Sequence, residues 1–119
     1  MGTQSYKDLI VWQKSMTLTT EVYSLTKKLP KDELFGLTSQ LKRAVVSIPS
    51  NIAEGNGRAS KKEYSRFLSV ARGSKSEVET QLLICVNLGY LQQSEIEPAL
   101  NLCIEISKML NAMLSKFAE

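Results

Sequence analysis

The 119-residue sequence contains no histidine and only two cysteines, Cys85 and Cys103. Without histidine the chain cannot form a Ser-His-Asp triad or a Cys-His pair, and it lacks the most common metal ligand of proteins. The two cysteines form no CxxC pair and fall on apolar stripes, so we expect reduced core residues and not a metal or redox site. These absences predict a protein that is not an enzyme and that needs no metal and no cofactor.

Long apolar runs are also missing. No segment approaches the roughly 18 to 20 apolar residues of a membrane span, and the N-terminus lacks the basic-then-apolar layout of a signal peptide. Hydrophobic residues nevertheless make up 43% of the chain, which is enough to build a core. We therefore expect a cytoplasmic protein with no membrane partner, folded as one domain over residues 1–119.

Strand-like alternation is absent too, whereas apolar residues recur at helical spacing four times. Ser5, Ser60 and Ser94 each precede an acidic residue by three positions, which is typical of a helix-capping box. Four amphipathic helices joined by short loops pack as an antiparallel up-down bundle, so the predicted fold class is an all-α four-helix bundle. The expected helices cover approximately residues 6–29, 37–54, 60–88 and 94–117.

Several details of the helices follow from single residues. Pro49 should kink the second helix, because proline lacks the N–H that bonds the carbonyl four residues back. Gly55 should end that helix as its C′ residue. Gly73 in the third helix suggests close approach of another backbone, with chance as the alternative. The expected core face of the first helix consists of Leu9, Trp12, Met16, Thr19, Tyr23, Thr26 and Leu29, and that of the third runs from Tyr64 to Leu88.

Positive charge is concentrated in one stretch. Residues 42–75 contain eight basic and two acidic residues, a net charge of +6, whereas the rest of the chain carries −3. Several of these residues surround the predicted start of the third helix, where free N–H groups and the helix dipole favour an anion. The alternative is a solvated helix face. The candidate nucleic-acid-binding residues are Lys42, Arg43, Arg58, Lys61, Lys62, Arg66, Arg72 and Lys75.

A second polar group should form where the second and third helices fold back on each other about Gly57. That fold places Arg43 level with Ala71 and Arg72, and Gln40 level with Ser74. We interpret the group as a hydrogen-bonded network that sets helix register or forms a subunit contact. The alternative is a binding or catalytic cluster, and an enzyme site ranks last because no nucleophile–base pair is present. The candidate network residues are Gln40, Asn51, Glu54, Ser74 and Glu77.

Specific strings carry a resemblance beyond periodicity. The segments DLIVWQKSM, LTSQLKRAVVSIPSNIAEG, SKKEYSRFLSVARGSKSEVETQL and LGYL closely resemble the bacterial 23S rRNA intervening-sequence proteins, also called the four-helix-bundle protein family. The resemblance covers about residues 5–117. It implies a four-helix bundle that assembles as a ring of five and has no established enzymatic activity. A more distant relative, the accessory protein of diversity-generating retroelements, implies a basic surface that binds nucleic acid and a reverse transcriptase.

The charge and the resemblance together predict a non-enzymatic, oligomeric protein that binds nucleic acid, RNA in particular. The expected partners are further copies of the chain, forming a homopentamer, together with RNA or DNA and a protein partner. The alternative is a protein-interaction scaffold or accessory subunit that binds no nucleic acid.

Overall fold

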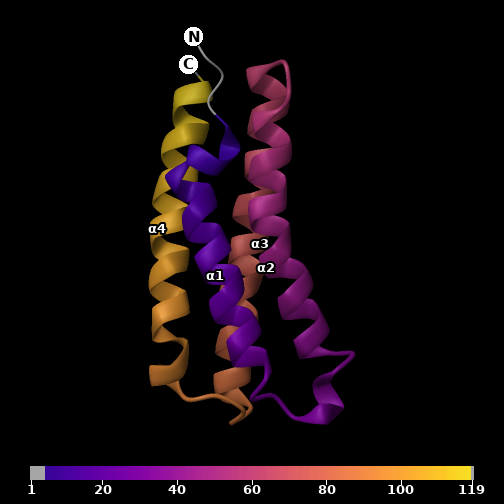
Figure 1. Ribbon diagram of the computed structural model, residues 1–119. Coiled ribbons are helices and arrows are strands. Elements are labelled where there is room, and N and C mark those ends of the chain that lie inside the picture. Colours follow the sequence, from indigo (N-terminus) through magenta and orange to yellow (C-terminus); the bar gives the residue numbers. More distant parts are fainter. Residues whose placement is uncertain (1–4, 119) are drawn as a thin grey trace.

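The computed structural model describes residues 5–118, and that range contains helices and turns but no strand. Four α-helices run up and down in alternation (Figure 1). Short 3₁₀ turns, η1 (Tyr6–Asp8) and η2 (Lys31–Glu33), precede the first and second helices. The prediction of an all-α four-helix bundle is confirmed. The helices are α1 (Ile10–Thr26), α2 (Leu37–Asn56), α3 (Lys61–Asn87) and α4 (Gln93–Phe117).

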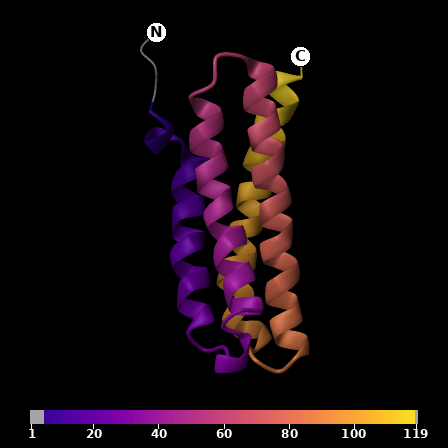
Figure 2. The same cartoon turned by 90° about the vertical axis from the view of Figure 1, so that its right-hand side faces the viewer.

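Each helix packs against its neighbours in sequence, and α1 also packs against α4, so the four helices enclose one elongated core. The bundle measures 49 × 23 × 20 Å along its principal axes. The start of α1, the end of α4 and the α2–α3 turn lie at one end, which we call the turn end (Figures 1 and 2). Within residues 5–118, no helix combines the length and the apolar character needed to span a bilayer.

The core face of the first helix agrees with the prediction only in part: Thr26 and Leu29 of the predicted stripe are buried and Leu9 and Trp12 pack against the core. Val11, Leu18 and Val22 are buried, whereas Met16 and Tyr23 of the predicted stripe are 43% and 38% exposed. The two stripes lie about one residue apart around the helix, and both have helical spacing. Helix α1 therefore carries a second apolar face at the surface. This face borders a groove beside α2, the α1–α2 groove, which is lined by Tyr6, Trp12, Met16, Thr19, Val46, Pro49, Ser50 and Ala53.

The other three helices bury the faces that the pattern predicts, with one exception. Leu88, at the end of α3, is 54% exposed. Helices α2 and α4 each have one broad apolar stripe, so the periodicity leaves no choice of face. The fully buried side chains include Leu41, Val45, Ile48 and Ile52 of α2, Leu68, Val78, Leu82 and Cys85 of α3, and Ile96, Cys103, Ile106 and Leu110 of α4.

Helix α2 runs without interruption through the buried Pro49, so the proline does not break it. The predicted kink is not confirmed. Proline removes the hydrogen bond that would reach the Val45 carbonyl. The Thr19 hydroxyl of α1 lies 3.5 Å from this carbonyl oxygen and also donates to the Ser15 carbonyl at 2.8 Å. A side chain of the neighbouring helix thus compensates part of the lost bond.

Neither Gly55 of α2 nor Gly73 of α3 has its predicted role. Gly55 does not end α2, which continues to Asn56, and it is buried. A Cβ atom at Gly55 would lie 2.8 Å from Phe67 Cβ and 2.9 Å from Tyr64 Cδ1. A Cβ atom at Gly73, the predicted position of close approach, would meet no atom of another element within 4 Å. The closest approach of α2 and α3 therefore depends on Gly55.

Two helix starts also differ from the sequence prediction. The Ser5 hydroxyl accepts from the Lys7 backbone N–H at 3.1 Å and caps η1, and the extended Leu9 delays α1 to Ile10. Helix α4 is capped by Gln92 with Glu95, two residues before the predicted Ser94 and Glu97. By contrast, Ser60 caps α3 as expected, since its hydroxyl accepts from the Glu63 N–H at 3.1 Å.

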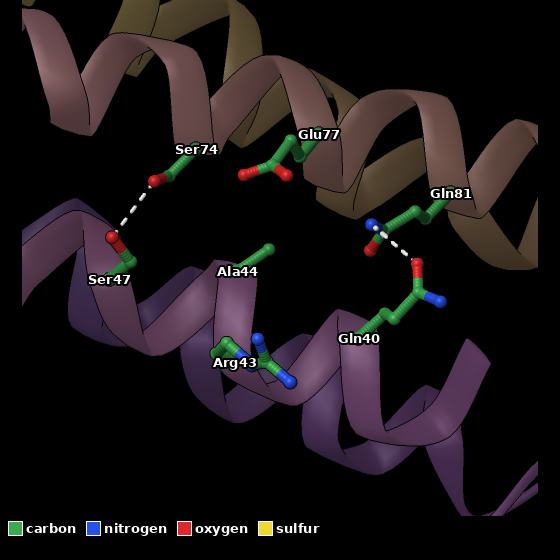
Figure 3. A pocket seen from close by; sticks show the side chains of 7 residues that line it. All are labelled: Gln40, Arg43, Ala44, Ser47, Ser74, Glu77 and Gln81. Atoms are coloured by element: carbon green, nitrogen blue, oxygen red, sulfur yellow. Dashed lines mark hydrogen bonds between the residues drawn. The ribbon is translucent and has the colours of Figure 1, made fainter. Parts of the chain in front are cut away.

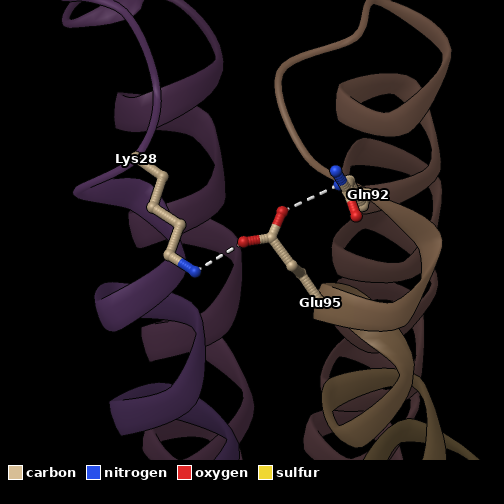
Figure 4. A network of polar contacts seen from close by, with 3 residues as sticks. All are labelled: Lys28, Gln92 and Glu95. Atoms are coloured by element: carbon tan, nitrogen blue, oxygen red, sulfur yellow. Dashed lines mark hydrogen bonds and ion pairs between the residues drawn. The ribbon is translucent and has the colours of Figure 1, made fainter.

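Glu95 links the start of α4 to the turn that follows α1 (Figure 4). One carboxylate oxygen accepts from the Gln92 backbone N–H at 2.9 Å, and the other lies 2.5 Å from Lys28 Nζ. The hydrogen bond from Lys28, followed by that from Gln92, holds the pKa of Glu95 below its ordinary value of 4.5. A carboxyl whose pKa is lowered by folding stabilises the folded state above its unfolded pKa, and this contribution is lost as the pH falls through the folded pKa.

We expect Glu95→Gln to lower the melting temperature at pH 7, because glutamine keeps the shape but loses the charge that attracts Lys28 and the helix N-terminus. The difference from the native chain should shrink as the pH falls below 4.5, since Glu95 itself then becomes neutral. Thermal melts followed by circular dichroism across this pH range test the effect. Glu97→Gln is the control, because Glu97 is exposed and its carboxylate accepts only from the Gln93 side chain among the described residues. A difference that persists unchanged at low pH would contradict the electrostatic explanation.

Candidate nucleic-acid interface

Four of the predicted basic residues gather at the turn end of the bundle. Arg58 lies in the α2–α3 turn, and Lys61, Lys62 and Arg66 follow on the first turns of α3. All four are exposed, and we call them the end patch. Lys62 and Arg66 border a surface hollow of about 560 Å³. Its remaining lining residues are Ser60, Glu63, Ser65 and Ser69, so hydroxyl groups lie beside the positive charges.

The local structure orients the end patch. Ser60 begins α3 and leaves the other first-turn N–H groups directed out of the helix, where an anion is favoured. The Arg58 guanidinium lies 2.7 Å from Glu54 Oε2 and 4.8 Å from the centre of the Phe67 ring. Arg66 lies 5.7 Å from the same ring centre. Such cation–π contacts restrict both guanidinium groups without burying their charge.

The other four basic candidates lie away from the end patch. Lys42 stacks over the Tyr23 ring of α1 at 5.0 Å, and Arg43 lies between α2 and α3. Arg72 donates to Asn111 Oδ1 of α4 at 3.0 Å. Lys75 is only 8% exposed, and its Nζ donates to Glu79 at 2.9 Å. The basic stretch of the sequence is therefore divided among several faces of the bundle, and Lys75 is too buried to contact a polyanion.

Two further lysines lie toward the turn end and were not among the candidates. Lys7 belongs to η1 and Lys116 to the last turn of α4, and both are exposed. Neither lies in the basic stretch of the sequence. The antiparallel order of the predicted helices could have identified them, because it brings the start of the first helix and the end of the fourth to the same end.

A second polar site, which we call the α2–α3 groove, lies between these two helices (Figure 3). It encloses about 400 Å³ and is lined by Gln40, Arg43, Ala44, Ser47, Ser74, Glu77 and Gln81. Two hydrogen bonds cross it: Ser47 to Ser74 at 2.8 Å, and Gln81 Nε2 to Gln40 Oε1 at 3.5 Å. Gln81 Oε1 is buried and has no hydrogen-bond partner in the described chain.

These contacts correct the predicted register of α2 against α3. Ser74 lies opposite Ser47 and not opposite Gln40, a displacement of about two helical turns. The reason is that α2 continues to Asn56 and the chain reverses over residues 57–60, beyond the expected pivot at Gly57. Ser47 and Gln81 were consequently missed as site residues. Their spacing from Ala44 and Ser74 along each helix is the signal that marks them.

The remaining network candidates have separate partners. Asn51 Nδ2 donates to the Ser47 carbonyl at 2.7 Å and to its hydroxyl at 2.9 Å, which extends the contact with Ser74. Glu54 pairs with Arg58 at the turn end. Glu77 is exposed and makes no ion pair with any residue from 5 to 118. Its charge, like that of Arg43 on the facing helix, remains available to a ligand.

The two cysteines lie in the core, apart from both sites. Both are buried and neither forms a disulfide. Burial, together with the nearby charge of Glu79, raises the pKa of Cys103 to about 12. Its thiol is therefore protonated at neutral pH and a poor nucleophile or metal ligand. Across residues 5–118, no three cysteine or acidic side chains gather in a way that could hold a metal ion.

Comparison with known proteins is consistent with this architecture. The family model described as 23S rRNA-intervening sequence protein matches residues 7–112. A crystal structure of a protein of unknown function from the S23 ribosomal protein family of Bacteroides thetaiotaomicron superimposes with a TM-score of 0.81 at 25% sequence identity. The match covers 88% of this chain and 98% of that one. No curated protein matches the sequence.

Proposed function

Because the chain belongs to the 23S rRNA-intervening sequence protein family, we propose that it is a non-enzymatic protein that binds nucleic acid, RNA in particular, through the end patch. The observation that carries the proposal is the convergence of Arg58, Lys61, Lys62 and Arg66 on the start of α3. Phosphates bind at helix N-termini and beside lysine, arginine and serine side chains. Several such contacts together release counterions, which makes polyanion binding favourable at low salt.

We further propose that the protein acts as a homo-oligomer of five copies in the cytoplasm. The pentamer is what the family resemblance implies. Support comes from the exposed apolar side chains of the α1–α2 groove, which a neighbouring copy could cover, and from the two free cysteines, which suit a reducing compartment. A native mass five times that of the 13.3 kDa chain is expected from native mass spectrometry. A single-chain mass at micromolar concentration would contradict the assembly.

The test of nucleic-acid binding is the triple variant Lys61→Glu, Lys62→Glu, Arg66→Glu. We expect its affinity for structured RNA to fall at least about tenfold at low salt, and the slope of log K against log salt to decrease by roughly 2 to 3, at 0.7–0.9 per lost phosphate contact. Fluorescence anisotropy measures both quantities. The matched control, Lys27→Glu, Lys31→Glu, Lys108→Glu, changes the net charge equally but leaves the end patch intact.

Three results would contradict the proposal. These are that the native protein binds neither structured RNA nor duplex DNA at low salt, that its affinity does not depend on salt, and that the control triple variant loses as much affinity as the end-patch variant. The α1–α2 groove supports the second candidate function, a protein-interaction scaffold. That function predicts a purified native oligomer with no excess absorbance at 260 nm and a single enriched protein partner in a pull-down.

A further inference from the structure

The α2–α3 groove holds opposite charges on its two walls. Arg43 extends from α2 and Glu77 from α3, yet within residues 5–118 they form no ion pair with each other. The Ser47–Ser74 and Gln40–Gln81 hydrogen bonds cross between the helices at the two ends of the space (Figure 3). Ala44 lies between the positions of Gln40 and Ser47 and contributes only a methyl group. The result is a short polar compartment with a cation on one side and an anion on the other.

We propose that this compartment binds a guanine base of single-stranded RNA. Guanine has two acceptors, O6 and N7, on one edge, and arginine is the side chain that most often reads them. Another edge of guanine carries the N1 and N2 hydrogens, which can donate hydrogen bonds to a carboxylate. Arg43 can therefore donate to O6 and N7, and Glu77 can accept from the N1 and N2 hydrogens. Adenine presents an acceptor at N1, which faces Glu77 unfavourably, so the site discriminates against it.

The carboxamides complete the match. Gln81 Oε1 is buried without a partner in the described chain, and an unpaired buried acceptor is costly. Because this oxygen is covered in the unliganded chain, the Gln81 side chain must turn toward the groove for an N–H of the base to satisfy it. Gln40 lies beside it and offers a further amide to the base or ribose. The Ala44 methyl contacts the flat face of the base, and the cavity of about 400 Å³ accommodates a nucleoside.

The inference rests on the proposed function, because the end patch supplies the phosphate contacts of the same strand. Arg66 and Ser74 lie on one helix, about 12 Å apart along its axis at 1.5 Å per residue. Gly73 has open space around it, and a second hollow of about 350 Å³ extends from Glu77 over this glycine. Arg66, Gly73 and Glu77 follow one another at spacings of seven and four residues, so they share one face of α3 along which a strand of a few nucleotides can lie.

The experiment compares short labelled oligouridine strands that carry one central guanosine or one central adenosine. Anisotropy at low salt is expected to give an affinity about tenfold or more higher for the guanosine strand, as one bidentate base contact provides. Glu77→Gln should abolish this preference, since glutamine keeps the volume but replaces one acceptor for the guanine N–H groups with a donor that suits adenine N1. Glu97→Gln, the same change at an exposed site on α4, should retain the preference.

Two outcomes overturn the inference: equal affinity for the two strands, or a guanosine preference that survives Glu77→Gln. Each leaves the proposed function intact when both strands still bind with a steep salt dependence. If the native protein binds neither strand nor structured RNA, the proposed function fails, and the guanine site fails with it. The end-patch triple variant separates the two contributions, because it should weaken both strands by the same factor.

Discussion

Gly55→Ala is expected to lower the free energy of unfolding by about 1 to 2 kcal/mol, whereas Gly73→Ala is expected to raise it by up to about 1 kcal/mol. Both glycines lie inside helices, where alanine is intrinsically better by about 1 kcal/mol. At Gly55 the new Cβ would lie 2.8 Å from Phe67 Cβ and 2.9 Å from Tyr64 Cδ1, so α2 and α3 must separate. At Gly73 nothing lies within 4 Å, and only the helix propensity changes.

Urea denaturation at matched protein concentrations measures both variants against the native chain, with the m-values showing whether the transitions stay comparable. Gly55→Ala as stable as Gly73→Ala would contradict the close approach of α2 and α3 near the turn. A destabilised Gly73→Ala would mean that the open side of α3 is covered in the assembled protein, because the isolated chain offers nothing for the methyl group to meet. The pair of variants therefore tests the fold and the assembly with one substitution type.

The architecture could be predicted because helical periodicity leaves few alternatives when a helix has one apolar stripe. Helices α2 and α4 illustrate this, since their buried residues are those that the spacing predicts. Helix α1 does not, because it has two apolar stripes about 100° apart. The positions of α2 and α4 around α1 decide which stripe is buried, and a single sequence does not reveal these positions. The face containing Met16 and Tyr23 was misassigned for this reason.

The candidate interface was harder to predict than the fold, because charge was read along the sequence and a helix distributes neighbouring residues around its axis. Arg66, Arg72 and Lys75 lie close in sequence, but they point to solvent, to Asn111 of α4 and into the bundle. Prediction of the residues that line the α2–α3 groove depended on the register of α2 against α3. An error of a few residues in the position of the turn moved every pairing by about two helical turns, so Ser47 and Gln81 were missed.

Leu82→Ala is expected to lower the free energy of unfolding by about 3 to 4 kcal/mol, because a fully buried leucine leaves both lost apolar contacts and a cavity. Leu83→Ala, one residue further along α3, should cost less than about 1 kcal/mol, since Leu83 is 44% exposed. The change in helix propensity is the same at both positions and cancels in the comparison. Chemical denaturation of the two variants therefore isolates the effect of burial in the core.

The neighbouring leucine is also informative about assembly. Leu83 and Ile84 form an exposed apolar pair on α3. If Leu83→Ala were to cost as much as Leu82→Ala, and the loss depended on protein concentration, Leu83 would be buried between copies and its exposure in the single chain would not describe the working protein. A small cost that is independent of concentration would indicate that any subunit contact lies elsewhere, and the α1–α2 groove is one exposed apolar candidate. In that arrangement the groove is covered by a neighbouring copy, while α3 keeps both the end patch and the α2–α3 groove open to nucleic acid.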